Sequence, residues 1–270
     1  MNKYFAAAAN VILYFVVFYF TMFAFGRLLA IEAYGKLIEA NPSLHLVFIF
    51  GVTMLLYWLL FKLNLVVGNT ERQSFVQAVK FVKLPPKMVV FSLLIGLAGA
   101  LASLGLLEIV SLKEVFPDLE ANVDSMMGSG NFLLIVATLG ILFPALEEVI
   151  FRGLIFNELK KAMPMWIAVV LQMIGYVAVQ PSAGFMLISV VTGTVYCLIY
   201  MIARSLWAPI IVQMTAMSLF FIGYKLDVGK GWMNSDPAAI AITLVGVAGM
   251  IALTIWLNRR NRDVQPTMTF

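Results

Sequence analysis

Charged residues are scarce in this chain, in which Asp, Glu, Lys and Arg together make up 12% of 270 residues. A soluble globular domain carries about 25% charged and about 45–50% apolar residues. Here 62% of the residues are hydrophobic, so the chain lacks the polar groups needed to cover a folded surface in water. The shortage of charge excludes a soluble fold and predicts an integral membrane protein.

Cysteine pairs and a continuous basic face are missing as well. The one cysteine, Cys197, lies in an apolar stretch and has no partner for an intrachain disulfide, which is typical of a buried structural thiol. The formal net charge is +4, but the basic residues lie between apolar stretches and form no patch. We therefore expect no nucleic-acid partner, because such partners need clustered Lys and Arg.

Long apolar stretches are what the chain does have. Most are roughly 18–25 residues long, the length of helix that crosses about 30 Å of hydrocarbon. The sequence predicts an all-α integral membrane fold, a bundle of about eight transmembrane helices. The connections are too short to fold alone, so residues 1–270 form a single polytopic domain. The apolar stretches cover residues 4–30, 44–62, 88–107, 131–151, 165–180, 184–203, 206–224 and 237–257.

The loops alternate in charge along the chain. Of the 18 Lys and Arg residues, 13 fall on the side of the termini and 5 on the other, whereas loop 108–130 carries five acidic residues against Lys113. The positive-inside rule then predicts that both termini lie in the cytoplasm. The membrane that we expect for this multi-pass protein is a bacterial cell membrane. On that side, residues 71–87 fit either an amphipathic helix on the inner leaflet or an ordinary basic loop.

Three ionisable residues follow the fourth apolar stretch directly, and charges at membrane depth are functional candidates by default. Glu148 and Arg152 are four residues apart, so they share a helix face and are expected to pair. Glu147 is rotated by about 100° from Glu148 and has no basic neighbour in sequence. We expect Glu147 to face the bundle interior as a candidate general base.

The sequence Glu147-Glu-Val-Ile-Phe-Arg152-Gly-Leu resembles the EExxxR signature of the CPBP (Abi) family. These are eight-helix membrane proteins that include the glutamate-type CAAX prenyl proteases. A second stretch, from Gly193 through Arg204 to Ile211, is similar to the segment leading into the family's last motif. The likeness covers about 130–225, and it implies a CPBP-like core at about 88–225.

The other family motifs are altered here. The FxxxH motif corresponds to Tyr176 and Gln180, and the HxxxN or HxxxD motif corresponds to Gln213 and Met217. In the family, the first glutamate and the first histidine are thought to activate a water, while the second histidine and the Asn or Asp hold the oxyanion. The single histidine, His45, begins the second apolar stretch at the opposite membrane face and cannot replace them.

These replacements remove most of the chemistry that the resemblance implies. Glutamine does not titrate near neutral pH, and losing an acid–base partner costs about 10²–10⁴ in rate. Met217 removes an oxyanion donor, which costs about 10²–10³. Two carboxylates with two glutamines also make a poor zinc site. We therefore expect no metal and no cofactor, with Glu147, Glu148 and Arg152 as the remaining family residues.

Three functions stay open. The first is a catalytically degenerate member, a pseudoprotease, that binds or regulates a partner membrane or envelope protein within the lipid bilayer. The second is an active CAAX-like intramembrane endopeptidase that uses Glu147. The third is a small transporter or flippase. For all three functions we expect Glu147, Gln180 and Gln213 to surround one cavity that opens toward the cytoplasmic half. There they would form hydrogen bonds between helices, line a pocket for a peptide or lipid, or make up a catalytic site.

Overall fold

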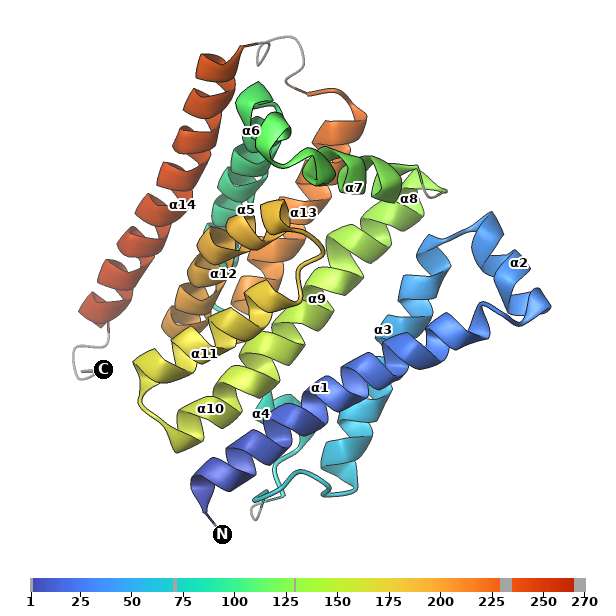
Figure 1. Cartoon of the computed structure of the whole chain (residues 1–270). Coiled ribbons are helices and arrows are strands. Elements are labelled where there is room, and N and C mark those ends of the chain that lie inside the picture. Colours follow the sequence, from blue (N-terminus) through green and yellow to red (C-terminus); the bar gives the residue numbers. More distant parts are fainter. Residues whose placement is uncertain (1, 70–71, 129, 229–234, 265–270) are drawn as a thin grey trace.

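The computed structural model describes residues 2–69, 72–128, 130–228 and 235–264, and side chains only up to residue 260. This part of the chain is a helical bundle without strands (Figure 1). Its elements, where η marks a π-helix, are α1 (Lys3–Leu28), α2 (Glu32–Ala40), α3 (Ser43–Lys62), α4 (Phe75–Ala78), α5 (Pro86–Leu107), α6 (Val110–Val115), α7 (Pro117–Met127), α8 (Phe132–Ile135), η1 (Val136–Leu142), α9 (Phe143–Glu148), η2 (Val149–Ile155), α10 (Phe156–Ala162), α11 (Met165–Ala178), α12 (Ala183–Ala203), α13 (Trp207–Lys225) and α14 (Asp236–Val264).

Seven helices within the described residues are long and apolar enough to cross a membrane, which confirms the predicted membrane bundle. The fourth of these runs without a break from α8 to α10, residues Phe132–Ala162. It contains two π-helical segments, η1 and η2, on either side of α9. π-helical turns widen a helix locally and are frequent at functional sites.

The fifth predicted span, residues 165–180, is too short to cross the membrane. Helix α11 has 14 residues, about 21 Å at 1.5 Å per residue, so it reaches only part of the way across the hydrocarbon. The chain turns back within the bundle before α12 begins (Figure 1). Irregular backbone at membrane depth is tolerated where it is enclosed by protein or lines a cavity, and this turn carries Gln180 and Pro181.

Close helix contacts in the second half of the bundle depend on small residues. A Cβ atom added at Gly96 of α5 would lie 2.6 Å from the Val212 carbonyl oxygen of α13. One added at Gly246 of α14 would lie 2.5 Å from the Ala102 backbone nitrogen. Small residues let helix backbones approach in lipid, where no hydrophobic driving force presses helices together. Helices α5, α13 and α14 therefore form a tight group beside the site.

The basic segment before α5 is a loop rather than an amphipathic surface helix. Its only helix in the described part is the single turn α4, capped by Ser74 and Gln77; residues 70–71 lie outside the description. Phe75 and Val79 are buried in the bundle. The apolar side chains of this segment therefore pack against protein, which favours the basic-loop interpretation.

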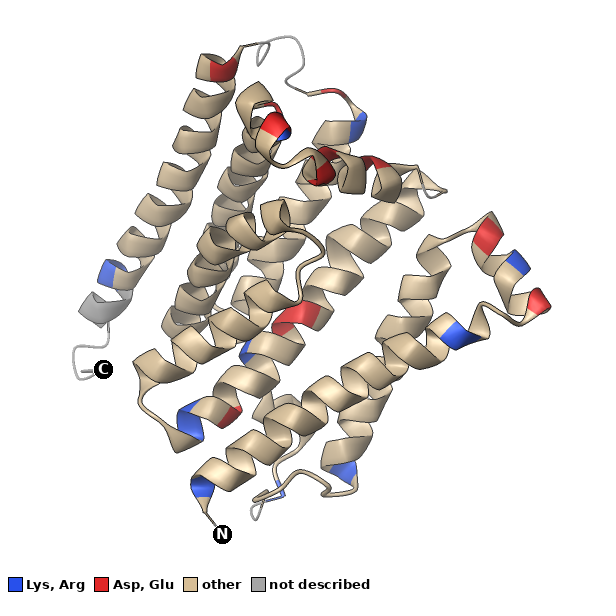
Figure 2. Ribbon diagram, in the orientation of Figure 1, with Lys and Arg blue, Asp and Glu red and all other residues tan. Residues whose placement is uncertain are grey.

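Charge divides between the two ends of the bundle (Figure 2). Acidic residues cluster on α6 and α7, which cross the end away from the termini (Figures 1 and 2). Helix α7 is amphipathic, and its own residues Leu119 and Val123 are buried on the face toward the bundle. The opposite end, where α1 begins and α14 ends, carries mostly Lys and Arg.

Candidate functional site

A buried ion pair lies near the centre of the continuous helix Phe132–Ala162, which runs from α8 to α10 and is called the long helix below. Arg152 Nη1 donates to Glu148 Oε1 at 2.8 Å, and both side chains are 0% exposed. This confirms the pairing predicted from their spacing. Arg152 Nη2 also donates to the Gly193 carbonyl oxygen of α12 at 3.0 Å. The guanidinium therefore joins the long helix to α12 as well as neutralising the carboxylate.

Two tyrosines enclose this guanidinium. The Arg152 Cζ atom lies 4.2 Å from the ring centre of Tyr176 and 5.6 Å from that of Tyr196. Cation–π contacts of this kind gain strength when water is excluded. Gly193 permits the arrangement, because an added Cβ would lie 2.7 Å from the Tyr176 ring. Tyr196 and Gly193 were not singled out as site residues in the sequence, since an aromatic or glycine in an apolar helix carries no signal of its own.

Glu147 occupies a different face of the same helix. It is the central residue of the 31-residue helix Phe132–Ala162, so it lies deep in the bundle. Gln213 Nε2 of α13 donates to Glu147 Oε2 at 2.5 Å. The Gln180 side chain interacts with the same carboxylate and donates to the Tyr176 carbonyl oxygen at 3.2 Å. The structure thus brings Glu147, Gln180 and Gln213 together, as predicted.

One cavity of about 500 Å³ connects these residues. Glu147, Tyr176, Gln180, Gln213 and Met217 all line it, so every degenerate motif position borders the same space. The rest of its wall is mainly apolar and comes from α3, α5, α7, α12 and α13. Its volume is in the range of pockets that hold a small molecule or a few side chains.

The direction of the cavity differs from the prediction. We expected it in the half that carries the termini, but it extends from Glu147 to Leu119, Val123 and Met126 of α7 at the other end. Toward the termini, the space is filled by the Glu148–Arg152 pair and by large buried side chains such as Phe151 and Phe156. Packing of distant residues, which the sequence pattern does not reveal, decides this direction.

A second, smaller space also borders Glu147. It measures about 70 Å³ and lies between Phe18 of α1, the long helix and the turn at residues 179–181. Glu147 and Gln180 line both spaces. The carboxylate therefore stands at the boundary between the main cavity and the α1 side of the bundle.

His45 takes no part in this arrangement. Its Nδ1 atom lies 3.0 Å from the Tyr34 hydroxyl, and its ring contacts Phe25, so it belongs to an aromatic group at the α2 end. Among the residues that the structure describes, no three His, Cys, Asp or Glu side chains gather as a metal site would require. The side chains that hydrogen-bond to Glu147 in the described structure are the two amides of Gln213 and Gln180.

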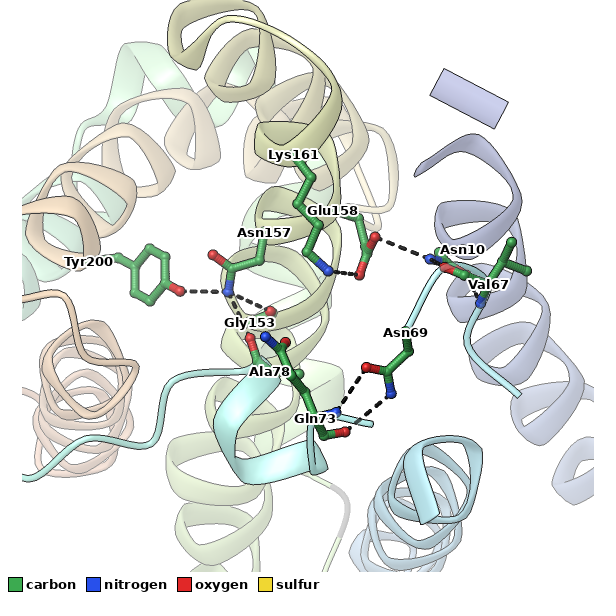
Figure 3. A network of polar contacts seen from close by, with 10 residues as sticks. All are labelled: Asn10, Val67, Asn69, Gln73, Ala78, Gly153, Asn157, Glu158, Lys161 and Tyr200. Carbon is green, nitrogen blue, oxygen red and sulfur yellow. Dashed lines mark hydrogen bonds and ion pairs between the residues drawn. The ribbon is translucent and has the colours of Figure 1, made fainter. Parts of the chain in front are cut away.

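A polar network that the sequence reasoning missed lies nearer the termini (Figure 3). Asn10 Nδ2 of α1 donates to Glu158 Oε2 of α10 at 3.1 Å and to the Val67 carbonyl oxygen at 2.9 Å. Glu158 also pairs with Lys161 at 2.7 Å. Asn157 Nδ2 lies 2.7 Å from the Tyr200 hydroxyl. The signal available in the sequence was Asn10 itself, a lone polar residue within the first apolar stretch.

Comparison with known proteins locates a family match in the same region. Residues 129–219, about a third of the chain, match the family model described as type II CAAX prenyl endopeptidase Rce1-like. The matched segment contains Glu147, Glu148 and Arg152 together with the positions of both altered motifs. No curated protein and no solved structure matches the chain.

Proposed function

We propose that this membrane protein, whose residues 129–219 match the model of the Rce1-like CAAX prenyl endopeptidases, is a pseudoprotease that uses the corresponding site to bind a partner rather than to cut it. The observation that carries the proposal is the pairing of the Glu147 carboxylate with two amides. An amide donates a hydrogen bond but neither takes nor returns a proton near neutral pH. Glu147 therefore lacks the acid–base partner that water activation requires.

The Gln213–Glu147 bond has a structural role that fits this proposal. It links the long helix to α13 across the wall of the cavity, much as polar pairs hold transmembrane helices together. Met217, four residues further along α13, presents a thioether to the same space. A thioether offers no hydrogen bond to an oxyanion. The wall thus keeps its shape, but it lacks a titratable partner for Glu147 and the oxyanion donor that the family has at position 217.

The occupant that the cavity fits is an apolar segment of another membrane or envelope protein, with bilayer lipid around it. The walls are mostly apolar, and the carboxylate and both amides lie at the Glu147 end. A volume of about 500 Å³ accommodates a few side chains but no whole helix. Gln213 Oε1 is buried without a hydrogen-bond partner among the described residues, and a buried acceptor of this kind favours a ligand that donates to it.

The proposed location is a bacterial cell membrane with both termini in the cytoplasm. The basic residues gathered at the end of the bundle that bears the termini support this orientation (Figure 2). The main cavity then faces the outer half of the bilayer, beneath the acidic helix α7. Such a position suits an envelope partner better than a cytoplasmic one.

An active endopeptidase remains the rival function, because Glu147 borders the cavity and is open to a substrate there. Photo-crosslinking separates the two. A benzophenone side chain at Phe185, which lines the cavity, is compared with one at Leu187, which is exposed on the lipid side of the same helix. We expect Phe185 to give a discrete adduct with an intact partner protein, with Leu187 giving lipid adducts alone.

The crosslinking is repeated with Glu147→Gln, which keeps the shape of the side chain. A pseudoprotease retains the Phe185 adduct with an uncut partner in both backgrounds. A partner that is cleaved with Glu147 and accumulates uncut with Glu147→Gln would show a working protease and overturn the proposal. Equal adducts from Phe185 and Leu187 would show that the cavity is not the binding site.

A further inference from the structure

Three cationic side chains converge where α10 and α12 end, at the end of the bundle that bears the termini. Asn157 Nδ2 of α10 donates to the Ala78 carbonyl oxygen at 3.1 Å, which holds the loop that carries Lys80 against α10. The positive charges of Lys80 and Arg204 both act on the Lys160 ammonium. The three residues come from three separate segments: the loop before α5, α10 and the C-terminal cap of α12. Their meeting is therefore a product of the tertiary fold.

Backbone contacts hold this cationic cluster, Lys80, Lys160 and Arg204, in place. The Leu206 backbone nitrogen donates to the Lys80 carbonyl oxygen at 3.0 Å, and Ser205 Oγ donates to the Val82 carbonyl oxygen at 2.5 Å. Lys80 and Arg204 both have left-handed backbone, with φ of 61° and 52°. Residues with a Cβ adopt that conformation at a cost, so the surrounding contacts impose it.

No carboxylate neutralises the cluster within the described part of the chain. The ion pairs there use other lysines and Arg152. Glu158, on the same helix as Lys160, is already bound by Lys161 at 2.7 Å and by Asn10 at 3.1 Å. Like charges held together repel, more strongly where water is partly excluded, and Lys160 is half-buried. The arrangement is unfavourable unless an anion joins it.

The surroundings place the cluster at headgroup depth. Trp207, which begins α13, is 44% exposed, and its ring centre lies 5.0 Å from that of Phe81, the residue after Lys80. Exposed tryptophan at helix ends is typical of the membrane–water interface. Lys160 Nζ lies 5.7 Å from the Phe156 ring centre, so its aliphatic stem follows the bundle while its charge reaches the boundary.

We propose that Lys80, Lys160 and Arg204 form a binding site for the phosphate of an anionic lipid headgroup. Arginine offers a planar fork that fits phosphate oxygens, and lysines supply further donors and charge. Basic pockets between transmembrane helices bind anionic headgroups in this way. A phosphate there ties the loop, α10 and the α12–α13 turn together. It steadies the end of the helix that carries Glu147 and Arg152, independently of any proteolysis.

The test uses the full chain in neutral detergent, with thermal unfolding measured before and after adding phosphatidylglycerol, phosphatidylcholine or inorganic phosphate. We expect phosphatidylglycerol alone to raise the unfolding temperature. The site variant combines Lys80→Asn, which tolerates left-handed backbone, with Lys160→Gln. It should bind phosphatidylglycerol at least about tenfold more weakly, as the loss of charge-assisted hydrogen bonds implies. The control, Lys87→Gln, removes an exposed lysine near the same end and should respond like the unmodified chain.

The unfolding temperature of the site variant without lipid is a second test. Removing two like charges relieves repulsion, so the site variant should unfold at the same temperature as the unmodified chain or higher. A full phosphatidylglycerol response in the site variant, equal to that of Lys87→Gln, would overturn the site. An equal response of the unmodified chain to inorganic phosphate would overturn the assignment to lipid. Lower stability of the site variant without lipid would show that the lysines serve the fold instead.

Discussion

Gln213 and Glu147, 66 positions apart in sequence, are joined by a 2.5 Å hydrogen bond across the wall of the main cavity. Gln213→Leu removes the donor and leaves the carboxylate with less support, so it should lower the free energy of unfolding by about 1 kcal/mol. Glu147→Gln keeps an acceptor and should change stability less. Unfolding in detergent of both single variants and the double variant gives the coupling, expected near 0.6 kcal/mol. Strictly additive effects would show that the bond contributes nothing.

Arg152 serves the fold through Glu148 and the Gly193 carbonyl oxygen. Arg152→Ala leaves a buried carboxylate unpaired, so the free energy of unfolding should fall by about 3–5 kcal/mol, seen as reduced yield and unfolding temperature. Arg152→Lys should rescue only part of this, because an ammonium lacks the fork that reaches both partners. The control is Lys36→Ala, which breaks the exposed pair with Glu32, worth at most about 1 kcal/mol. Equal effects of Arg152→Ala and Lys36→Ala would contradict a structural role for the buried pair.

Membrane orientation is accessible because the chain has one cysteine, Cys197, which is buried. In a Cys197→Ala background, Ser125→Cys places a thiol on the exposed side of α7, and Lys83→Cys places one at the end with the termini. With both termini in the cytoplasm, an impermeant maleimide should label Ser125→Cys in intact cells and Lys83→Cys only after permeabilisation. The reverse pattern would invert the topology and place the cavity on the cytoplasmic side.

How far the sequence predicts this site depends on the range of each interaction. Glu148 and Arg152 pair because they are one helical turn apart. Gln180 and Gln213 are far from Glu147 in sequence, and they were found only because they occupy positions of the family's motifs. The predicted stretch 165–180 ends within two residues of the end of α11, but its apolar pattern did not show that this helix is too short to cross the hydrocarbon. Asn10 and Glu158 lie 148 positions apart, and no local pattern connects them.

Restoring the family residues should show whether only the catalytic side chains are missing or whether the cavity can no longer hold a substrate. The triple variant Gln180→His, Gln213→His and Met217→Asn returns titratable groups and an oxyanion donor to a cavity that already holds Glu147. If only the chemistry has been lost, this variant should gain peptidase activity that disappears with Glu147→Ala. A folded triple variant without activity would show that the cavity itself no longer admits a substrate.

The pseudoprotease proposal is tested most directly by the cleavage of a prenylated CAAX peptide by purified protein in liposomes. The unmodified chain and Glu147→Ala are compared at equal folded concentration, judged by their unfolding curves. Because the groups that hydrogen-bond to the Glu147 carboxylate in the described part of the chain are amides, the two should show the same background rate. Cleavage by the unmodified chain that is abolished in Glu147→Ala would contradict the proposal and show that a glutamate with two glutamines suffices for catalysis.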